Sequence, residues 1–139
     1  MDSVNITIKA RQKAPDGEAE NIHHRLQGQY AFKGGRHYLR YLDSHLAAGH
    51  EVPTTIKASA DELLIMRRGL FRSDQRFVPG VETRADYHTP YGTIELVMHT
   101  SSLQVDFGEG AGSVRLRYSL QANGAHVGEY DLEIKAEQA

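Results

Sequence analysis

The stretch from His88 to His99, HTPYGTIELVMH, joins a proline–aromatic–glycine corner to a run in which apolar and polar residues alternate. One face of this run is apolar and the other is polar: Ile94, Leu96 and Met98 against Thr93, Glu95 and His99. A period of two is typical of a strand with one buried face. The corner indicates a turn between two neighbouring strands, because proline cannot donate a ladder hydrogen bond and glycine relieves crowding.

The same alternation recurs along most of the 139 residues and predicts about ten strands. The expected extended segments are 4–9, 20–33, 36–42, 53–58, 63–67, 70–77, 81–87, 93–99, 103–107, 113–120 and 130–134. Residues from Lys135 onward are expected to form a solvated tail.

Turn residues separate these segments. Gly34-Gly35 and Asn123-Gly124 predict tight hairpins, since both pairs tolerate the positive φ angles of primed turns. The other expected turns and loops are 13–17, 79–80, 100–102 and a mobile glycine-rich hairpin loop over 108–112. Gly28 is the expected bend in the long segment 20–33.

The sequence of two segments is also compatible with a short helix. Residues 59–68 fit either a short capped helix or a strand, and the alternation in 70–77 favours the strand because that segment needs a partner alongside. Residues 43–52 are the least regular, and 44–48 could form one helical turn that is too short to be stable alone.

About ten strands with one apolar face each must bury that face in a sandwich or in a closed barrel. The hairpin-rich connectivity favours an all-β, antiparallel, mostly up-and-down barrel of eight to ten strands. The length predicts a single domain over residues 1–139 with a core of its own.

Composition narrows the classes of partner. The formal net charge is −2, from 16 basic and 18 acidic side chains that are interspersed, so we expect neither nucleic acid nor membrane as a partner. The chain has no cysteine, no basic–apolar leader at its start and no apolar run long enough to span a bilayer. We therefore expect a cytoplasmic protein.

One set of residues resembles a known family. It comprises Gly34-Gly35-Arg36-His37-Tyr38, Tyr41, Arg68-Gly69, Phe77, Tyr87 through Gly92, Leu116, Tyr118, Leu120 and Asn123-Gly124. In this order they resemble the YwiB-like bacterial family of unknown function, over nearly the full chain. The resemblance implies a calycin, that is, a lipocalin-like β-barrel, and it implies no activity or catalytic residues. The Ala- and His-rich segment 45–50 departs from the family pattern.

Catalytic and metal motifs are not found in the sequence. The eight histidines are His23, His24, His37, His45, His50, His88, His99 and His126, and no two stand at the i, i+2 spacing of one strand face. No nucleophile–base set, phosphate loop or dinucleotide fingerprint is present. We therefore expect no metal, no cofactor and no enzymatic activity.

The candidate site is a ligand pocket in the barrel interior or at its rim. Tyr30, Tyr87 and Tyr118 fall on the apolar faces, and Tyr91 lies in the corner at a rim. Arg68, beside Gly69, could point into the barrel mouth, where a buried guanidinium would require an anionic partner. The alternative is that these tyrosine rings have a structural role and fill the core.

Two hypotheses remain at this point. The first is a non-enzymatic module that binds a small, partly apolar molecule, with an anionic group as one option, through these five residues. The second is a protein–protein interaction or structural domain that forms a homodimer through its outer face, at the two-faced strand Tyr38–Tyr41. A hollow core would favour the first hypothesis and a filled core the second.

Overall fold

A computed structural model describes residues 2–46 and 49–139 and confirms the all-β prediction. Its ten strands are β1 (Asp2–Lys13), β2 (Ala19–Lys33), β3 (Arg36–Asp43), β4 (Val52–Ser59), β5 (Glu62–Arg67), β6 (Ser73–Phe77), β7 (Glu82–Thr89), β8 (Gly92–Gly108), β9 (Ala111–Ala122) and β10 (Ala125–Gln138). No helix in the described residues is long and apolar enough to cross a membrane.

The strands form one antiparallel sheet in up-and-down order, β6-β5-β4-β3-β2-β1-β10-β9-β8-β7. The sheet curls until β6 meets β7, where Arg72 and His88 exchange two backbone hydrogen bonds of 3.0 and 2.9 Å. The Thr83 hydroxyl adds a hydrogen bond to the Arg76 carbonyl across the same seam. The result is a nearly closed barrel, which removes most exposed strand edges.

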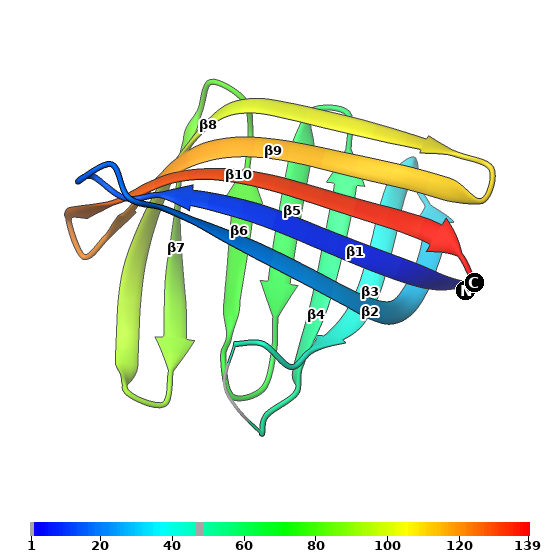
Figure 1. Ribbon diagram of the computed structural model, residues 1–139, viewed down its shortest axis with the longest axis horizontal. Helices are drawn as coiled ribbons and strands as arrows, with labels where there is room; N and C mark the ends of the chain where they lie inside the picture. The colour runs from blue at the N-terminus through cyan, green and yellow to red at the C-terminus, as the bar shows by residue number, and fades with distance from the viewer. Residues whose placement is uncertain (1, 47–48) are drawn as a thin grey trace.

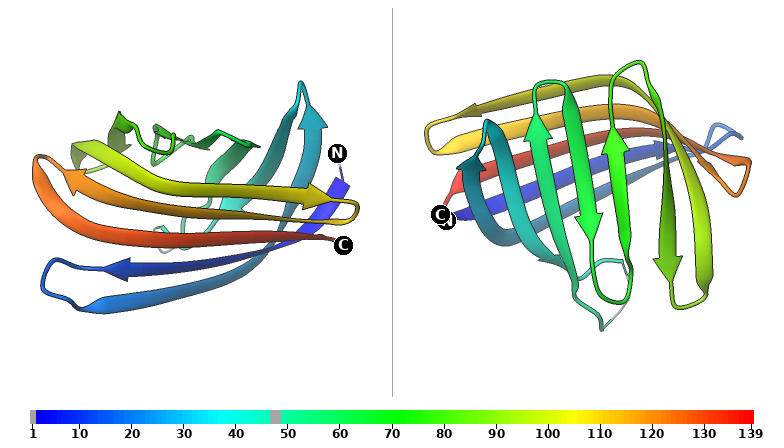
Figure 2. Two further views of the ribbon diagram at one scale, coloured as in Figure 1. Left: turned by 90° about the horizontal axis from the view of Figure 1, so that it is seen from above. Right: turned by 180° about the vertical axis from the view of Figure 1, so that it is seen from behind.

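The short strands β4 to β6 cross the long strands β1, β9 and β10 steeply (Figures 1 and 2). The long strand β8 bends between the two sides, and its first half runs beside β7. Both chain ends, the β2–β3 hairpin and the β8–β9 hairpin lie at one end of the molecule (Figure 1). This end is called the termini end below.

Large, fully buried side chains fill the middle of the barrel. They come from both sides: Ile6, Leu39, Ile56, Leu63, Phe77, Met98, Leu116 and Ile134. Alternation along each strand places these residues on the inner face, and their burial is the main contribution to stability.

The structure confirms the main turn predictions. Gly34 and Gly35 have φ angles of 57° and 77°, and Asn123 and Gly124 have φ angles of 49° and 82°. In the corner between β7 and β8, the Thr89 hydroxyl donates to the Gly92 carbonyl at 2.8 Å and accepts from the Tyr91 amide at 3.1 Å. The stretch that suggested the fold is thus a hairpin between neighbouring strands.

The segment 59–68 is extended, as expected. Residues 62–67 form β5, which pairs with β6 from Leu63↔Phe77 to Arg67↔Ser73. The helical turn considered for 44–48 includes residues 47–48, which lie outside the described residues.

Three predictions about the long strands were wrong. The turn expected at Thr100-Ser101-Ser102 is a bulge within β8, where the register with β9 shifts by one residue. A bulge bends a strand without ending it, so β8 runs from Gly92 to Gly108. The glycine-rich loop is shorter than expected, since β9 already begins at Ala111. The tail expected from Lys135 is part of β10, which pairs with β1 as far as Val4↔Gln138 and buries Ala136.

Three large apolar side chains at the ends of strands are exposed. Phe32, at the end of β2, is 59% exposed, and Val81 and Leu70, which precede β7 and β6, are exposed as well.

Candidate functional site

The interior carries one arginine, Arg67, at the end of β5. In β5, Leu63 and Ile65 are buried, and Arg67 continues the same inward face. Its side chain is only 16% exposed. Its cross-strand partner on β6 is Ser73, which is also buried. The pair lies at the end of the barrel where β3 ends and β4 begins, which is called the Arg67 end below.

Arg67 has weak protein partners. Its Nη2 lies 4.0 Å from Asp43 Oδ2, and its Nη1 lies 3.5 Å from Gln75 Oε1. Asp43 is engaged elsewhere, since its Oδ1 accepts the His45 backbone amide at 2.9 Å. Within the described residues, Arg67 Nε and the Ser73 hydroxyl are buried and have no hydrogen-bond partner. Buried polar groups are normally paired, so these two atoms require a further partner.

The charge of this arginine acts on three tyrosines. Burial raises the pKa of Tyr41 to about 12, and the Arg67 guanidinium opposes part of that rise. Burial also raises the pKa of Tyr87 and of Tyr118, and Arg67 acts on both in the same way. Tyr118 packs against Phe77, with ring centroids 4.7 Å apart. These hydroxyls therefore remain protonated at neutral pH and can donate hydrogen bonds.

The raised pKa values predict a loss of stability in alkali. The pKa of Tyr41 is about 12 in the folded protein and 10.0 as an ordinary tyrosine, so the unfolded chain ionises first as the pH rises. This contribution to the free energy of unfolding is constant below pH 10 and is lost between pH 10 and pH 12, a total of about 3 kcal/mol. Urea unfolding at a series of pH values, followed by circular dichroism, measures it.

The matched variants are Tyr41→Phe and Tyr91→Phe. Tyr41→Phe should flatten the decline above pH 10, whereas Tyr91→Phe should leave it unchanged because Tyr91 is 98% exposed at the hairpin tip. Equal alkaline profiles for the wild type and Tyr41→Phe would contradict this assignment.

The structure separates the five residues predicted from sequence. Tyr87 and Tyr118 lie around Arg67, but Arg68 is 51% exposed and its Nη1 pairs with Asp74 Oδ1 at 2.8 Å. The expectation that Arg68 points into the mouth was therefore wrong, and Arg67 takes that place. Tyr30 lies at the termini end, and Tyr91 points into solvent.

Arg68 was predicted in place of Arg67 because the sequence does not reveal which residues of β5 face inward. Leu64 and Met66 are partly buried on the outer face, so the run Leu63 to Met66 is apolar on both faces and its alternation is hidden. The pairing with β6 settles which face of β5 points inward. Ser73, Gln75 and Phe77 are all buried, and they pair with Arg67, Ile65 and Leu63.

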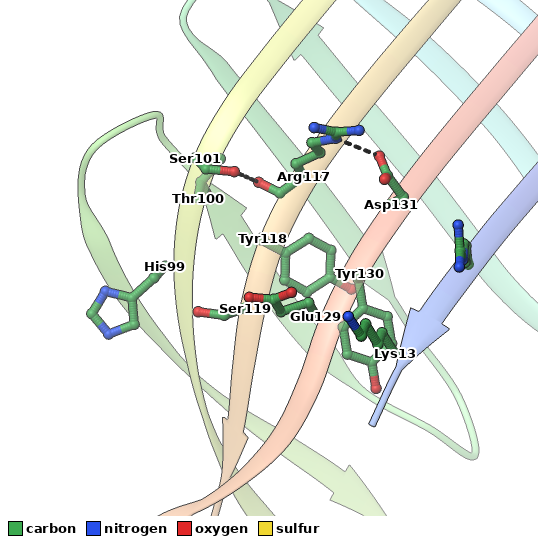
Figure 3. A pocket seen from close by; sticks show the side chains of 11 residues that line it. Lys13, His99, Thr100, Ser101, Arg117, Tyr118, Ser119, Glu129, Tyr130 and Asp131 are labelled. Atoms are coloured by element: carbon green, nitrogen blue, oxygen red, sulfur yellow. Dashed lines mark hydrogen bonds and ion pairs between the residues drawn. The ribbon is translucent and has the colours of Figure 1, made fainter. Parts of the chain in front are cut away.

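A groove of about 550 Å³ crosses β8, β9, β10 and β1 (Figure 3). The rings of Tyr118 and Tyr130 stack there with centroids 5.0 Å apart. At the groove, Arg117 Nε bonds Asp131 Oδ1 at 2.9 Å, and His99 Nε2 lies 3.1 Å from Glu82 Oε1. Such exposed pairs contribute little energy.

Histidines do not assemble a metal centre in the described chain. The rings of His24 and His45 lie 3.6 Å apart, close to Asp43. Even so, among residues 2–46 and 49–139 no three His, Cys, Asp or Glu side chains are placed to hold a metal ion.

Fold and site together define an antiparallel β-barrel with a filled middle and a partly buried arginine among polar groups at one end. Residues 6–134 match a family described as a domain of unknown function, DUF1934, and the chain belongs to this family.

Two comparisons with the YwiB protein of Bacillus subtilis agree with this membership. The chain is 37% identical to the "Uncharacterized beta-barrel protein YwiB" of strain 168 over 114 residues, which is 82% of this chain and 75% of that protein. The crystal structure of that protein superimposes with a TM-score of 0.89 at 31% identity, covering 99% of this chain and 92% of the other. The barrel fold expected from the sequence is therefore confirmed.

Proposed function

We propose that this barrel binds a small, partly apolar molecule whose anionic or hydrogen-bond-accepting head lies against Arg67. One observation carries the proposal: Arg67 Nε and the Ser73 hydroxyl, side by side across β5 and β6, are buried and have no partner among the described residues. A ligand oxygen is the kind of group that both atoms can bind.

The surroundings of Arg67 specify the ligand's chemistry. The guanidinium presents a fork of donors that matches a carboxylate, and the protonated hydroxyls of Tyr41, Tyr87 and Tyr118 can add further donors. The aromatic rings offer an apolar wall to the rest of the molecule. The filled middle of the barrel counts against a ligand in the interior, so the proposed ligand is small and stays at the Arg67 end.

Binding without chemical conversion is part of the proposal. A general base needs a pKa near the working pH, and burial moves the pKa of all three tyrosines in the opposite direction. The cytoplasmic location expected from the sequence belongs to the same proposal.

The test compares Arg67→Met with Arg68→Met, two neighbouring arginines of which only the first faces inward. Octanoate and phenylacetate serve as probes in calorimetric titrations, and native mass spectrometry of the purified protein searches for a bound organic molecule. Arg67→Met should weaken probe binding by at least about tenfold, since a charged hydrogen bond contributes about 1.5–3 kcal/mol.

Arg68→Met should bind the probes like the wild type, because its guanidinium lies at the surface beside Asp74. Circular dichroism establishes that both variants are folded. The proposal fails if the wild type carries no adduct and binds neither probe, or if the two variants lose binding equally.

A further inference from the structure

The termini end carries an exposed aromatic side chain next to a small apolar cavity. Phe32, 59% exposed, contacts the ring of His37 at a centroid distance of 4.8 Å, and His37 stacks on Phe107 at 4.3 Å. Phe107 in turn lines a cavity of about 80 Å³, together with Val4, Tyr30 and Ala136. A protruding ring and an apolar recess therefore lie at the same end of one molecule.

A glycine lies beneath one wall of the cavity. Gly112 pairs with Phe107 across β8 and β9, and a Cβ at position 112 would overlap the Phe107 ring. The ring therefore lies over Gly112, and residues of the β8–β9 hairpin line the cavity beside Val4, Tyr30 and Ala136. An engineered cavity of about 150 Å³ holds a whole benzene molecule, so this recess has room for the leading edge of a phenyl ring.

Charges at the two features have opposite signs. The β2–β3 hairpin that carries Phe32 also carries Lys33 and Arg36, and both are exposed. Two exposed acids lie around the cavity: Asp2 lines it, and Glu109 stands between the lining residues Gly108 and Gly110. Among the ion pairs of the described residues, none involves any of these four charges.

We propose that this end is a self-complementary dimer interface, in which Phe32 of each copy enters the acid-rimmed cavity of the other. A twofold axis satisfies both contacts at once, since ring and recess belong to the same surface. Opposite charges then meet, with Lys33 and Arg36 of each hairpin facing Asp2 and Glu109 of the other copy. The contact is small and is expected to be reversible.

The interface is independent of the Arg67 mouth, because the two features lie at opposite ends of β3. It also differs from the dimer contact expected from sequence, the outer face of Tyr38–Tyr41. Leu42 is the exposed apolar residue at the end of that outer face, and it serves below to distinguish the two surfaces.

Sedimentation velocity of the full chain over about 10 μM to 1 mM tests the interface, a range suited to a small reversible contact. The wild type should pass from monomer to dimer, and Phe32→Ala should shift the transition at least about tenfold in concentration. The hairpin variant Lys33→Glu/Arg36→Glu and the rim variant Asp2→Lys/Glu109→Lys should each be monomeric, because each repels its own copy. An equimolar mixture of these two variants should form a heterodimer.

The control Arg25→Glu/Arg40→Glu makes the same change in net charge on the outer faces of β2 and β3, and it should dimerise like the wild type. Three results would overturn the proposal: a wild type that stays monomeric throughout, a mixture of the hairpin and rim variants that does not associate, or a dimer broken by Leu42→Glu but not by the hairpin variant. The last would place the interface on the outer face of β3.

Discussion

Replacing Phe77 with alanine is expected to lower the free energy of unfolding by about 4 kcal/mol. Phe77 is 1% exposed on β6 and is one of the largest fully buried side chains of the barrel. Its ring packs against Tyr118 at 4.7 Å, and its backbone pairs with Leu63. Removing the ring costs both its transfer from water and a cavity that the close-packed interior cannot collapse to fill.

The position of Phe77 adds to this cost. β6 has five residues and forms one side of the barrel seam, where the backbone contacts to β7 are few. Side-chain packing therefore holds β6 in place, and Phe77 is the largest side chain that does so. Weaker packing here should also raise the amide hydrogen exchange of β6 and β7 above that of β1 and β10.

Urea unfolding of Phe77→Ala beside Phe32→Ala measures the effect. Phe32 is the matched control because the same substitution there removes an exposed ring and should cost less than about 1 kcal/mol. The measurement belongs at low protein concentration, where association through Phe32 plays no part. Equal losses in the two variants would show that burial in the barrel interior does not determine the cost.

Gly28→Ala is expected to destabilise the protein by about 3 kcal/mol, although it adds only one methyl group. A Cβ at position 28 would overlap the Arg40 carbonyl oxygen and lie 2.6 Å from Ile6 Cδ1 and 3.2 Å from Tyr41 Cβ. The backbone cannot move away easily, because Gly28 is paired with Val4 of β1 and with Tyr41 of β3.

This crowding explains why the sequence places glycine there. β2 passes from its pairing with β1 to its pairing with β3 around Gly28, and Figure 1 shows the strand curving through this region. The sharp curvature brings the two neighbouring strands close to the glycine Cα. A glycine without a side chain is the residue that such a close approach allows.

Gly108→Ala is the control for Gly28→Ala, since a Cβ at position 108 meets nothing within 4 Å. It should change the free energy of unfolding by less than about 0.5 kcal/mol. The urea midpoints of the two variants can be compared directly if the slope of unfolding free energy against urea concentration is the same, because the difference then reflects stability. A Gly28→Ala variant as stable as Gly108→Ala would contradict the close approach.

Much of the fold could be predicted from local patterns. The alternation in Thr93 to His99, the glycine pair 34–35 and the pair Asn123-Gly124 correspond to a strand and two hairpins. Strand ends were less predictable, because pairing extended β10 through Ala136 and a bulge carried β8 past Thr100. Both outcomes depend on neighbouring strands that are distant in sequence.

The candidate site could be predicted only in part. Tyr87 and Tyr118 were identified because strict alternation places them on inner faces. Arg67 was missed because its strand is apolar on both sides, so that its phase depends on the pairing with Ser73. Tyr30 and Tyr91 lie away from Arg67, at the termini end and at an exposed hairpin tip. No local sequence pattern predicts which end of the barrel a tyrosine side chain reaches.

The amino-acid sequence by itself determined that this protein is an all-β chain of antiparallel hairpins, because a period of two and the conformational demands of tight turns are local properties. Only the tertiary structure decided that Arg67 faces inward with an unpartnered Nε, and that Phe32 protrudes beside an acid-rimmed cavity. Both features depend on register and closure, which are set by contacts between strands far apart along the chain.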